Sequence, residues 1–543
     1  MTYWEQRAID SIGRMEAAVN ETLPELVKSF EKAKRDLNDQ IYRFYGRYAV
    51  NNKISLEEAK KILTFSELKD FRGNLKEYEK LAKDSVGTFN LEVSNLSTKA
   101  RITRLQALYA QCDAILQRLY QEQKKQIEST AKETFNSEYY HSLFNIEDYT
   151  GFQFEFSKPA TSFIQKIIEQ PVYGADISTH LWRQDIDTGF KIRQTLNNMF
   201  VTGRPPQDFA EELQKAIGVI RVDTNGNVTG TGKKYEAYRL LYNESAHVVN
   251  QADLQAYKDD GLEEYEVIGT LDLHTCSVCQ PYDGKHYPLN KAVEGVNYPS
   301  FHVNCRCTSA PYIPELADLS TTRMSRDPIT GKSVETKAQT YEQWRKELDK
   351  KYDAEKMKTE QKKVENESSD FAQYRQYKSI LKKDAPKSFA KFQDMKYNKP
   401  EKWQREKSFY VYKQKYPSAG IEHYDIYHEL QTLGISKGIV LPPEKVSSYI
   451  LEDTTAKDPT HIMKRMRERH ITDDDVHGYV NNALVMFDQW KGARKAFYSS
   501  KGVTIVTRHG NDWIAKTAMS KFDFDEDAEK ILEVVRKHVK RKS

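Results

Sequence analysis

The chain has 543 residues, enough for about three or four domains. Charged residues make up 30% of it and hydrophobic residues 38%, and no run of about 18 apolar residues is present, which excludes a membrane-spanning helix. The opening residues, "MTYWEQRAIDSIGRMEAAVNE", lack the basic and apolar segments of a signal peptide, so we expect a reducing cytoplasm. In such a compartment, clustered cysteines predict metal binding or catalysis rather than disulfides.

The net charge of +4 is unevenly distributed along the chain. Residues 457–543 contain 18 Lys and Arg against 13 Asp and Glu, so this end is basic. A basic segment could contact nucleic acid, either RNA or packaged DNA. A solvated helix face has the same composition, and charge alone does not separate the two interpretations.

Residues 1–150 predict a long helical arm. Its apolar residues recur at helical spacing, as in the stripe formed by Leu26, Phe30, Ala33 and Leu37. Ser55 is placed to cap a short helix, because acidic residues follow it. A further amphipathic helix, free of Gly and Pro, is predicted over 96–135, and Cys112 lies on its apolar side as a small buried hydrophobe.

Residues 151–315 predict further helices, followed from residue 262 by a segment whose hydrophobic pattern is no longer helical. The sequence "GRPPQD" ends one helix at Gly203 and starts the next at Asp208. The segment 221–234, rich in Gly, Asn and Thr, predicts a loop, and the helix after it ends at Gly261. From 262 to 315 the hydrophobic period shortens and the cysteines appear, which predicts a small zinc-stabilised β-hairpin module.

Residues 316–437 predict a charged helical linker region, whose first part, 316–370, is either an exposed helix or partly disordered. From about Gly438 the order is helix, helix, short β-branched runs and a closing helix, which predicts an α+β unit with an antiparallel sheet over 438–543. The predicted fold class is therefore mainly α with α+β parts.

Four of the five cysteines lie within a short stretch of the chain. Cys276 and Cys279 share one tight turn, and Cys305 and Cys307 follow 25 residues after it, with His302 just before them. Zinc takes four sulfur or nitrogen ligands at tetrahedral angles, and two such knuckles can supply them.

Five candidates therefore compete for four places at the zinc ion. Cys276, Cys279 and Cys305 are favoured, with either His302 or Cys307 as the fourth ligand. His274 and His286 are weaker candidates, and redox chemistry at the first pair is an alternative. The Asp283-Gly284 pair is a hairpin signal that we expect to fold the second knuckle back onto the first. Such a closed site would stabilise the fold rather than catalyse a reaction.

"TLDLHTCSVCQPYDGKHYPL", followed by "PSFHVNCRC", resembles the signature of the phage Mu F-type minor head proteins. The residues that match the pattern in order are Asp272, Thr275, Cys276, Cys279, Asp283, Gly284, His302, Asn304, Cys305, Arg306 and Cys307. Upstream, Arg239, Asn243 and Glu244 also match, whereas Val303 stands where the family usually has Pro. The resemblance covers about residues 150–315. It implies a minor capsid protein of the virion, made in the host bacterial cytoplasm, with portal or capsid partners and a role in head assembly or DNA delivery.

The C-terminal unit resembles a second family, the barnase–EndoU–colicin–RelE-like nucleases, which include toxin domains fused to phage head proteins. "HIMKRMRERHIT" is similar to their opening helix and "WIAKTAM" to their closing strand. The resemblance implies catalytic roles for His461 and Arg465 on the helix and for Lys516 and Thr517 on the strand, with Arg508 as a further candidate. Metal-free RNA cleavage needs a base, an acid and a cation, and these residue types can supply them.

Three other functions are alternatives to a nuclease for the C-terminal unit. A tail that only binds DNA or the portal without catalysis would have the same composition. An ADP-ribosyltransferase tail lacks the required order of Arg, Ser-x-Ser and Glu-x-Glu motifs, and a zinc protease lacks an H-E-x-x-H motif.

Overall fold

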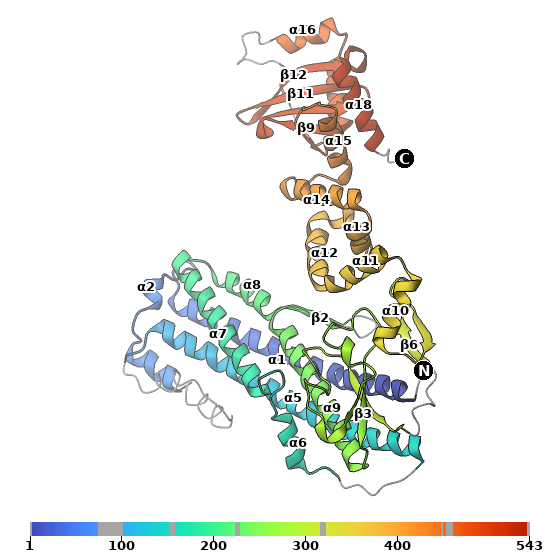
Figure 1. The fold of residues 1–543 in the computed structure, drawn as a ribbon. Helices are drawn as coiled ribbons and strands as arrows, with labels where there is room; N and C mark the ends of the chain where they lie inside the picture. Colours follow the sequence, from blue (N-terminus) through green and yellow to red (C-terminus); the bar gives the residue numbers. More distant parts are fainter. Residues whose placement is uncertain are drawn as a thin grey trace. The chain divides into compact units, whose positions relative to one another are not determined.

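Four long helices pack side by side in the first of two units of the chain, residues Met1–Asp353, in the computed structural model (Figure 1). The structure describes residues 3–73, 101–151, 158–222, 228–314, 322–446, 449–451 and 460–539. The long helices are α1 (Tyr3–Tyr48), α5 (Arg104–Thr150), α7 (Ile177–Thr202) and α9 (Gly232–Asp259). Shorter helices are α2 (Leu56–Ala59), α6 (Thr161–Ile168) and α8 (Pro206–Ile217).

The helical arm forms as the apolar pattern predicts. The stripe on α1 is buried in one core with residues of α5, α7, α8 and α9. Ser55 caps α2 by accepting the Glu58 amide N–H, and Cys112 is only 1% exposed, so both predictions are confirmed. Helix α5 begins at Arg104 because Thr103 forms a capping box with Gln106. The first part of the predicted helix, 96–100, lies outside the described residues.

Two boundaries before α9 differ from the predictions. Helix α7 ends at Gly203, whose φ of 64° suits glycine, but α8 starts at Pro206 rather than at Asp208. Proline is favoured in the first turn of a helix because it has no N–H to leave unpaired, which explains the earlier start. The prediction of a loop over 221–234 is wrong for part of this segment, because β1 (Ile220–Val222) and β2 (Val228–Gly230) pair antiparallel. Its middle, 223–227, lies outside the described residues.

A three-stranded antiparallel sheet follows α9, in the order β4-β3-β5. Its strands are β3 (Glu264–Ile268), β4 (His286–Pro288) and β5 (Thr308–Tyr312), with the 3₁₀ turns η1 (Gln280–Tyr282) and η2 (Leu289–Lys291) between them. Tyr265 and Val267 alternate with polar residues along β3 and pack against Ile146 of α5 and Leu254 of α9. The sheet is therefore anchored on the ends of two long helices.

The first part of the predicted linker contains a hairpin that the sequence interpretation missed. Strands β6 (Thr322–Arg326) and β7 (Ser333–Lys337) pair antiparallel, and α10 (Tyr341–Lys351) follows them. The turn forms because the Asp327 carboxylate accepts the amide N–H groups of Ile329 and Thr330. An exposed helix or disorder was thus the wrong expectation for 322–337, and residues 315–321 lie outside the described part of the chain.

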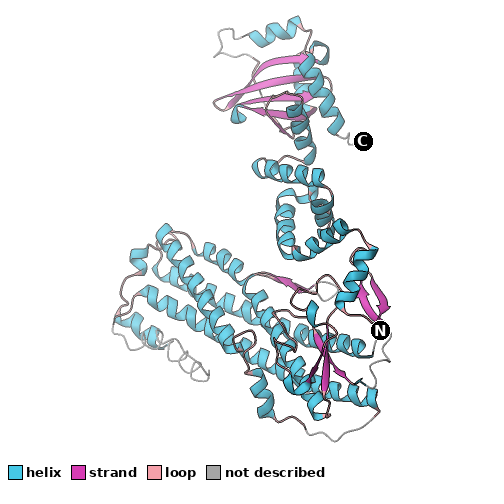
Figure 2. Cartoon of the chain, in the orientation of Figure 1, coloured by secondary structure: helices cyan, strands magenta, loops and turns pink. Residues whose placement is uncertain are grey.

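The second unit, Ala354–Ser543, begins with a group of helices and ends with a sheet (Figure 2). The helices are α11 (Ala354–Glu365), α12 (Glu367–Leu381), α13 (Phe389–Asn398), α14 (Pro400–Lys415) and α15 (Ile421–Thr432), with η4 (Lys382–Asp384) after α12. Their core is aromatic, with Phe392 and Phe409 fully buried among tyrosines. These helices lie within the region 316–437, for which the sequence predicts charged helices.

A five-stranded antiparallel sheet, in the order β12-β11-β10-β9-β8, forms the rest of this unit. The elements are β8 (Ile439–Leu441), α16 (His461–Glu468), α17 (Asp473–Asn481), β9 (Ala483–Gln489), η5 (Trp490–Gly492), β10 (Arg494–Ser499), β11 (Gly502–His509), β12 (Asp512–Ser520), η6 (Lys521–Asp523) and α18 (Glu526–His538). The sequence interpretation missed β8 and β9. Helix α17 begins with a capping box formed by Thr472 and Asp475.

Side chains alternate between the two faces of this sheet. Phe487 and Tyr498 face α15 and α18, whereas Met486 and Phe497 face α16 and α17. Helix α15, which precedes Gly438, therefore belongs to the core of the sheet. The four-part division of the chain at 150, 315 and 437 stays a prediction. Within the described part of the chain, no helix is long and apolar enough to span a bilayer.

Candidate metal centre

The two cysteine knuckles lie at the ends of neighbouring strands. Cys276 and Cys279 follow β3, in a turn where the Cys279 amide N–H donates to the Cys276 carbonyl over 3.0 Å. Cys305 and Cys307 directly precede β5. Strands β3 and β5 pair antiparallel, with Ile268 opposite Thr308, so this long-range pairing brings the knuckles together.

The Asp283-Gly284 turn exists but has a different role from the predicted one. The Lys285 amide N–H donates to the Tyr282 carbonyl over 3.0 Å, and Gly284 has a φ of 73°. The turn leads the chain into β4 beside β3, and does not fold the second knuckle onto the first. The expectation was wrong because the cue is local, whereas the knuckles meet through strands that are far apart in the sequence.

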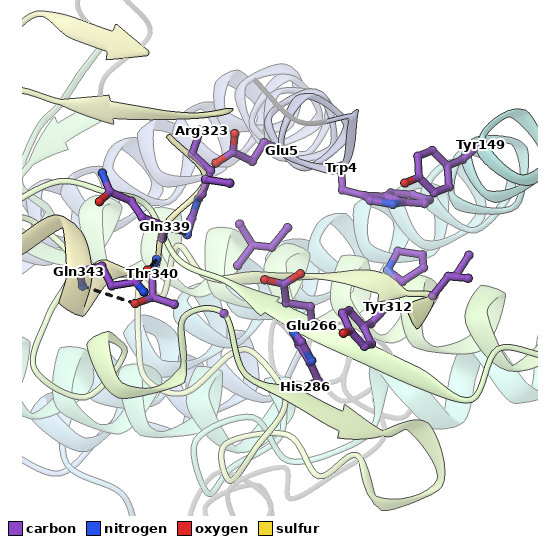
Figure 3. A pocket seen from close by; sticks show the side chains of 15 residues that line it. Trp4, Glu5, Tyr149, Glu266, His286, Tyr312, Arg323, Gln339, Thr340 and Gln343 are labelled. Atoms are coloured by element: carbon purple, nitrogen blue, oxygen red, sulfur yellow. Dashed lines mark hydrogen bonds and ion pairs between the residues drawn. The ribbon is translucent and has the colours of Figure 1, made fainter. Parts of the chain in front are cut away.

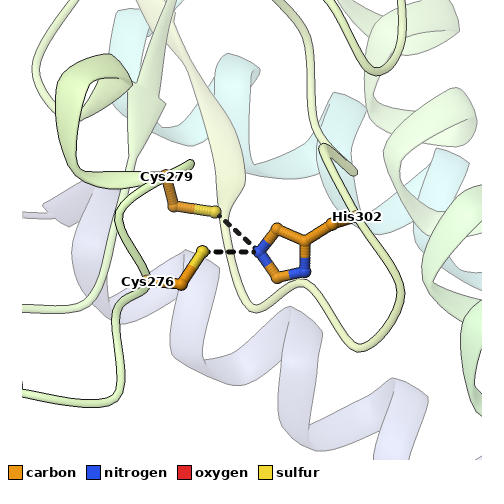
Figure 4. Close-up of side chains that lie close together, drawn as sticks. All are labelled: Cys276, Cys279 and His302. Atoms are coloured by element: carbon orange, nitrogen blue, oxygen red, sulfur yellow. Dashed lines mark hydrogen bonds between the residues drawn. The ribbon is translucent and has the colours of Figure 1, made fainter. Parts of the chain in front are cut away.

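The five predicted ligands form two overlapping groups within the described residues. Figure 4 shows the group formed by Cys276, Cys279 and His302. Cys276, Cys279 and His302 form one group, and Cys279, Cys305 and Cys307 form the other, with all ligand atoms of a group within 4.8 Å of one another. The His302 Nε2 atom lies 3.0 Å from the sulfur atoms of both Cys276 and Cys279. Cys279 is shared by the two groups and is therefore the centre of the cluster.

The distance between two of the sulfur atoms fits a shared tetrahedral ion. The sulfur atoms of Cys279 and Cys305 are 3.7 Å apart. Two thiolates bound to one zinc ion at about 2.3 Å and tetrahedral angles would be about 3.8 Å apart. The His302 Nδ1–H donates to the Val303 carbonyl over 2.9 Å, which leaves Nε2 without a proton and turned toward the sulfur atoms. These donors could hold a metal ion.

The thiols of the cluster also form hydrogen bonds with one another, and these bonds change how readily a thiol loses its proton. Hydrogen bonds from Cys279 and Cys307 hold the pKa of the Cys305 thiol well below its usual range. Cys279, Cys305 and Cys307 are all buried, and Cys276 is partly exposed. All four are free of disulfides.

An ion pair fastens the first knuckle to the second. The Arg306 guanidinium donates to both oxygens of the Asp272 carboxylate, over 2.9 and 2.7 Å. The same carboxylate accepts the amide N–H groups of His274 and Thr275, which fixes the turn that carries Cys276. Although burial opposes it, the Arg306 guanidinium holds the pKa of Asp272 below its ordinary value.

Helix α9 positions the second knuckle. The Asn243 side-chain oxygen accepts the Asn304 amide N–H over 2.7 Å, and Asn304 has a φ of 58° between His302 and Cys305. Tyr173 donates its hydroxyl to the His302 carbonyl over 2.6 Å. Asn243 belongs to the upstream motif of the resemblance, and this contact gives that residue a physical role.

A further residue of α9, His247, contacts the loop before the second knuckle. His247 is 2% exposed, and its Nδ1 lies 2.7 Å from a carboxylate oxygen of Glu294. Glu244, one turn earlier, is buried, and burial raises its pKa to about 8. Arg239, the third member of the upstream motif, has its carbonyl bonded to the Asn243 side chain.

The weaker histidine candidates are not in the cluster. His274 is exposed, and His286 stacks on Tyr312 with ring centroids 3.5 Å apart. Neither belongs to a group of ligand atoms found within the described residues. That four of the five candidates bind the ion, with His302 or Cys307 as the fourth, stays a prediction.

The predicted catalytic residues of the second unit are spread over three elements. His461 and Arg465 lie exposed on α16, where Arg465 pairs with Glu468 at 3.1 Å. Thr517 of β12 lies near the end of this helix, since the Arg469 guanidinium donates to its hydroxyl over 3.4 Å. Arg469 also donates to the Ala518 carbonyl over 2.8 Å, which fixes the end of α16 on β12.

Lys516 and Arg508 lie on the β11–β12 ladder. The register shifts between Ile505, which lies opposite Thr517, and Val506, which lies opposite Ala515, so Lys516 is the extra residue of a bulge in β12. Arg508 lies three residues beyond Ile505 on β11, or about 10 Å along the strand. The structure therefore brings Thr517 to the end of α16, but it does not gather all five residues at one point.

Residues 190–310 match the family model described as "Phage Mu protein F like protein". This segment contains α9, the three-stranded sheet up to Ala310 and all five candidate ligands. The comparison with curated proteins and the comparison with solved structures each found no match. The match supports the Mu F-like resemblance for this segment, and it does not extend to the C-terminal unit.

Proposed function

We propose that the chain is a minor capsid protein of a phage head, which acts in procapsid assembly or DNA delivery. The observation that carries this proposal is the match of residues 190–310 to the Mu F-like family, together with the clustered ligands inside that segment. Its expected partners are the portal and capsid proteins, and its expected location is the virion.

We infer that the ion held by the knuckles is zinc. Thiolate and imidazole donors suit zinc better than they suit magnesium or calcium, which prefer oxygen ligands. A zinc ion with four protein ligands has no open position for a substrate, so its role would be to stabilise the turns beside β3 and β5.

An exposed apolar stripe on α7 supports a partner in the head. Trp182, Ile186 and Phe190 are 50%, 53% and 65% exposed. They follow one another at every fourth position, so they lie on one face of the helix. Large apolar side chains grouped on a surface are typical of sites that bind another protein.

The test of the proposed function is the composition of virions from the phage or prophage that encodes the chain. We expect the protein to co-purify with filled heads through a density gradient and to resist removal by washing. A variant with Trp182, Ile186 and Phe190 changed to Ser should fold normally but be lost from heads. A protein present only in the unassembled fraction would contradict the proposal.

For the C-terminal unit we propose a metal-independent ribonuclease with His461, Arg465, Arg508, Lys516 and Thr517 as its candidate residues. Two observations favour it over a plain binding module. Helices α16 and α17 precede four of the five strands of an antiparallel sheet and cover one of its faces. A bulge interrupts the ladder at Lys516, the neighbour of Thr517, whose hydroxyl accepts from Arg469 at the end of α16.

Residues 354–543 and the full chain should both be assayed on transfer RNA with EDTA present. The shorter fragment keeps α15, which belongs to the core of the sheet. We expect cleavage that His461→Ala reduces at least about 100-fold, as for the loss of a general acid or base. Arg467→Ala is the control, because Arg467 lies exposed on the same helix and is not a candidate.

The alternative is a tail that binds DNA or the portal without catalysis. Intact RNA after incubation, combined with retention of DNA that weakens steeply with salt, would establish this alternative and exclude the ribonuclease.

A further inference from the structure

A cavity of about 320 Å³ lies in the first unit, away from the knuckles. Its walls come from the start of α1, the end of α5, the three-stranded sheet and the segment 338–343 (Figure 3). It is open to solvent on one side. None of the five clustered cysteine and histidine ligands lines it.

Aromatic rings form much of the wall. Trp4 and Tyr149 have ring centroids 5.0 Å apart, inclined at 57°. On the sheet side, His286 and Tyr312 stack with ring centroids 3.5 Å apart. The faces of such rings carry partial negative charge, so they attract organic cations.

The carboxylate of Glu266 points into the same space. Glu266 lies on β3 opposite His286 of β4, and its carboxylate faces the cavity between Tyr312 and the Arg323 side of the wall (Figure 3). Among the described residues, no side chain forms a hydrogen bond or an ion pair with this carboxylate. Burial raises the pKa of Glu266 to about 7.

The one guanidinium in the wall is already fully used. The Nε–H of Arg323 donates to Glu5, and its four terminal N–H groups donate to Asp283 and to the carbonyls of Gly269 and Gln339. A guanidinium has five N–H donors, so Arg323 has none left for a ligand. The cavity therefore offers a carboxylate and ring faces, but no free donor of Arg323 for an anion.

We propose that this cavity binds an alkylammonium or guanidinium group. The cation would lie against the rings of Trp4 and Tyr312 and pair with the Glu266 carboxylate. Two sources carry this chemistry: a Lys or Arg side chain of a partner polypeptide, and a free polyamine. The proposal does not depend on the head-protein function or on the C-terminal residues.

The test uses the full-length protein and isothermal titration with three probes. They are the peptide acetyl-Gly-Lys-Gly-amide, its Gln counterpart, and spermidine. We expect the Lys peptide or spermidine to bind and the Gln peptide not to bind. Binding of the Lys peptide alone identifies a partner polypeptide as the source, and binding of spermidine alone identifies a polyamine.

Glu266→Gln keeps the shape of the side chain and removes its charge, so we expect binding to weaken at least about tenfold, as for the loss of a close charge pair. Glu264→Gln is the matched control, because Glu264 lies on the same strand but does not line the cavity. Tyr312→Leu should also weaken binding. Thermal unfolding of each variant checks that it is folded.

Three results would overturn the proposal. The first is that neither cation binds the wild-type protein. The second is that Glu266→Gln, shown to be folded, binds as tightly as the wild type. The third is that inorganic phosphate competes for the cavity with the same affinity as the cations.

Discussion

The knuckles of the first unit and the candidate catalytic residues of the second differ in how they are held. The knuckle ligands are mostly buried, and each knuckle is fixed by hydrogen bonds, from Asp272 on one side and Asn243 on the other. His461 and Arg465 are exposed on a helix of eight residues, and Arg465 has only a surface ion pair. A preorganised site needs such supporting contacts. Substitutions at the knuckle ligands should therefore affect folding strongly, and substitutions at His461 and Arg465 should affect it weakly.

The largest effect is expected at Cys279, which both groups of ligands share. We expect Cys279→Ser to reduce the zinc content from about one ion per chain to almost none and to unfold the turns beside β3 and β5, since structural zinc contributes folding free energy. Metal analysis and protection of the remaining thiols from alkylation measure both effects.

The paired variants His302→Ala and Cys307→Ser identify the fourth ligand, because only the true ligand should be needed for zinc. His274→Ala is the control for His302→Ala, since His274 is exposed and outside the cluster. A metal-free protein with the wild-type unfolding midpoint would remove the basis of the zinc assignment.

The next largest effect is expected at Arg323, which joins α1, the Asp283 turn and β6. Its replacement by Leu leaves the Glu5 and Asp283 carboxylates without their cation in a buried position. We expect a loss of about 3–5 kcal/mol in the free energy of unfolding, measured by urea denaturation. Arg326→Leu is the control on the same strand, because Arg326 is exposed. Equal losses in the two variants would show that the buried ion pairs contribute nothing specific.

Whether the sequence could predict a feature depends on how far apart in the chain its interacting residues lie. The ligands at 276–307, the capping boxes and the buried face of α1 are local patterns, and the structure reproduces them. The pairing of β3 with β5 is long-range, so the sequence placed the knuckles together through the wrong turn.

Arg323 was missed for a related reason. It lies in a stretch whose high charge indicated a linker, and its partners Glu5 and Asp283 are distant in the sequence. Strands β8 and β9 were missed because their apolar runs are short and can equally be read as buried helix. The cavity lined by Glu266 depends on residues from seven helices and strands, and no local pattern indicates it.

A smaller effect is expected at Asp272, and it depends on pH. Asp272→Asn should lower the free energy of unfolding by about 1–2 kcal/mol at pH 7, because Arg306 loses its charged acceptor and is partly exposed. The pKa of Asp272 is lowered in the folded state, so its contribution is present above the unfolded pKa of about 3.9 and is lost as the pH falls through the lower folded value.

The difference between wild type and Asp272→Asn should therefore be constant from pH 7 to about 5 and decrease at lower pH. Denaturation at a series of pH values measures it. A difference that persists unchanged at pH 2 would mean that the carboxylate charge is not what Arg306 recognises. Arg306→Gln combined with Asp272→Asn completes the double-mutant cycle.

The smallest effects on stability are expected at His461 and Arg465. Both side chains are exposed, and an ion pair such as that of Arg465 with Glu468 contributes little. We expect His461→Ala and Arg465→Ala to change the free energy of unfolding by less than about 0.5 kcal/mol, as surface substitutions do. Ile462→Ala on the same helix should cost about 2–4 kcal/mol, because Ile462 is 2% exposed in the core. If His461→Ala destabilised the unit as much as Ile462→Ala, a loss of ribonuclease activity in that variant would report unfolding, and the contrast between the two regions would fail.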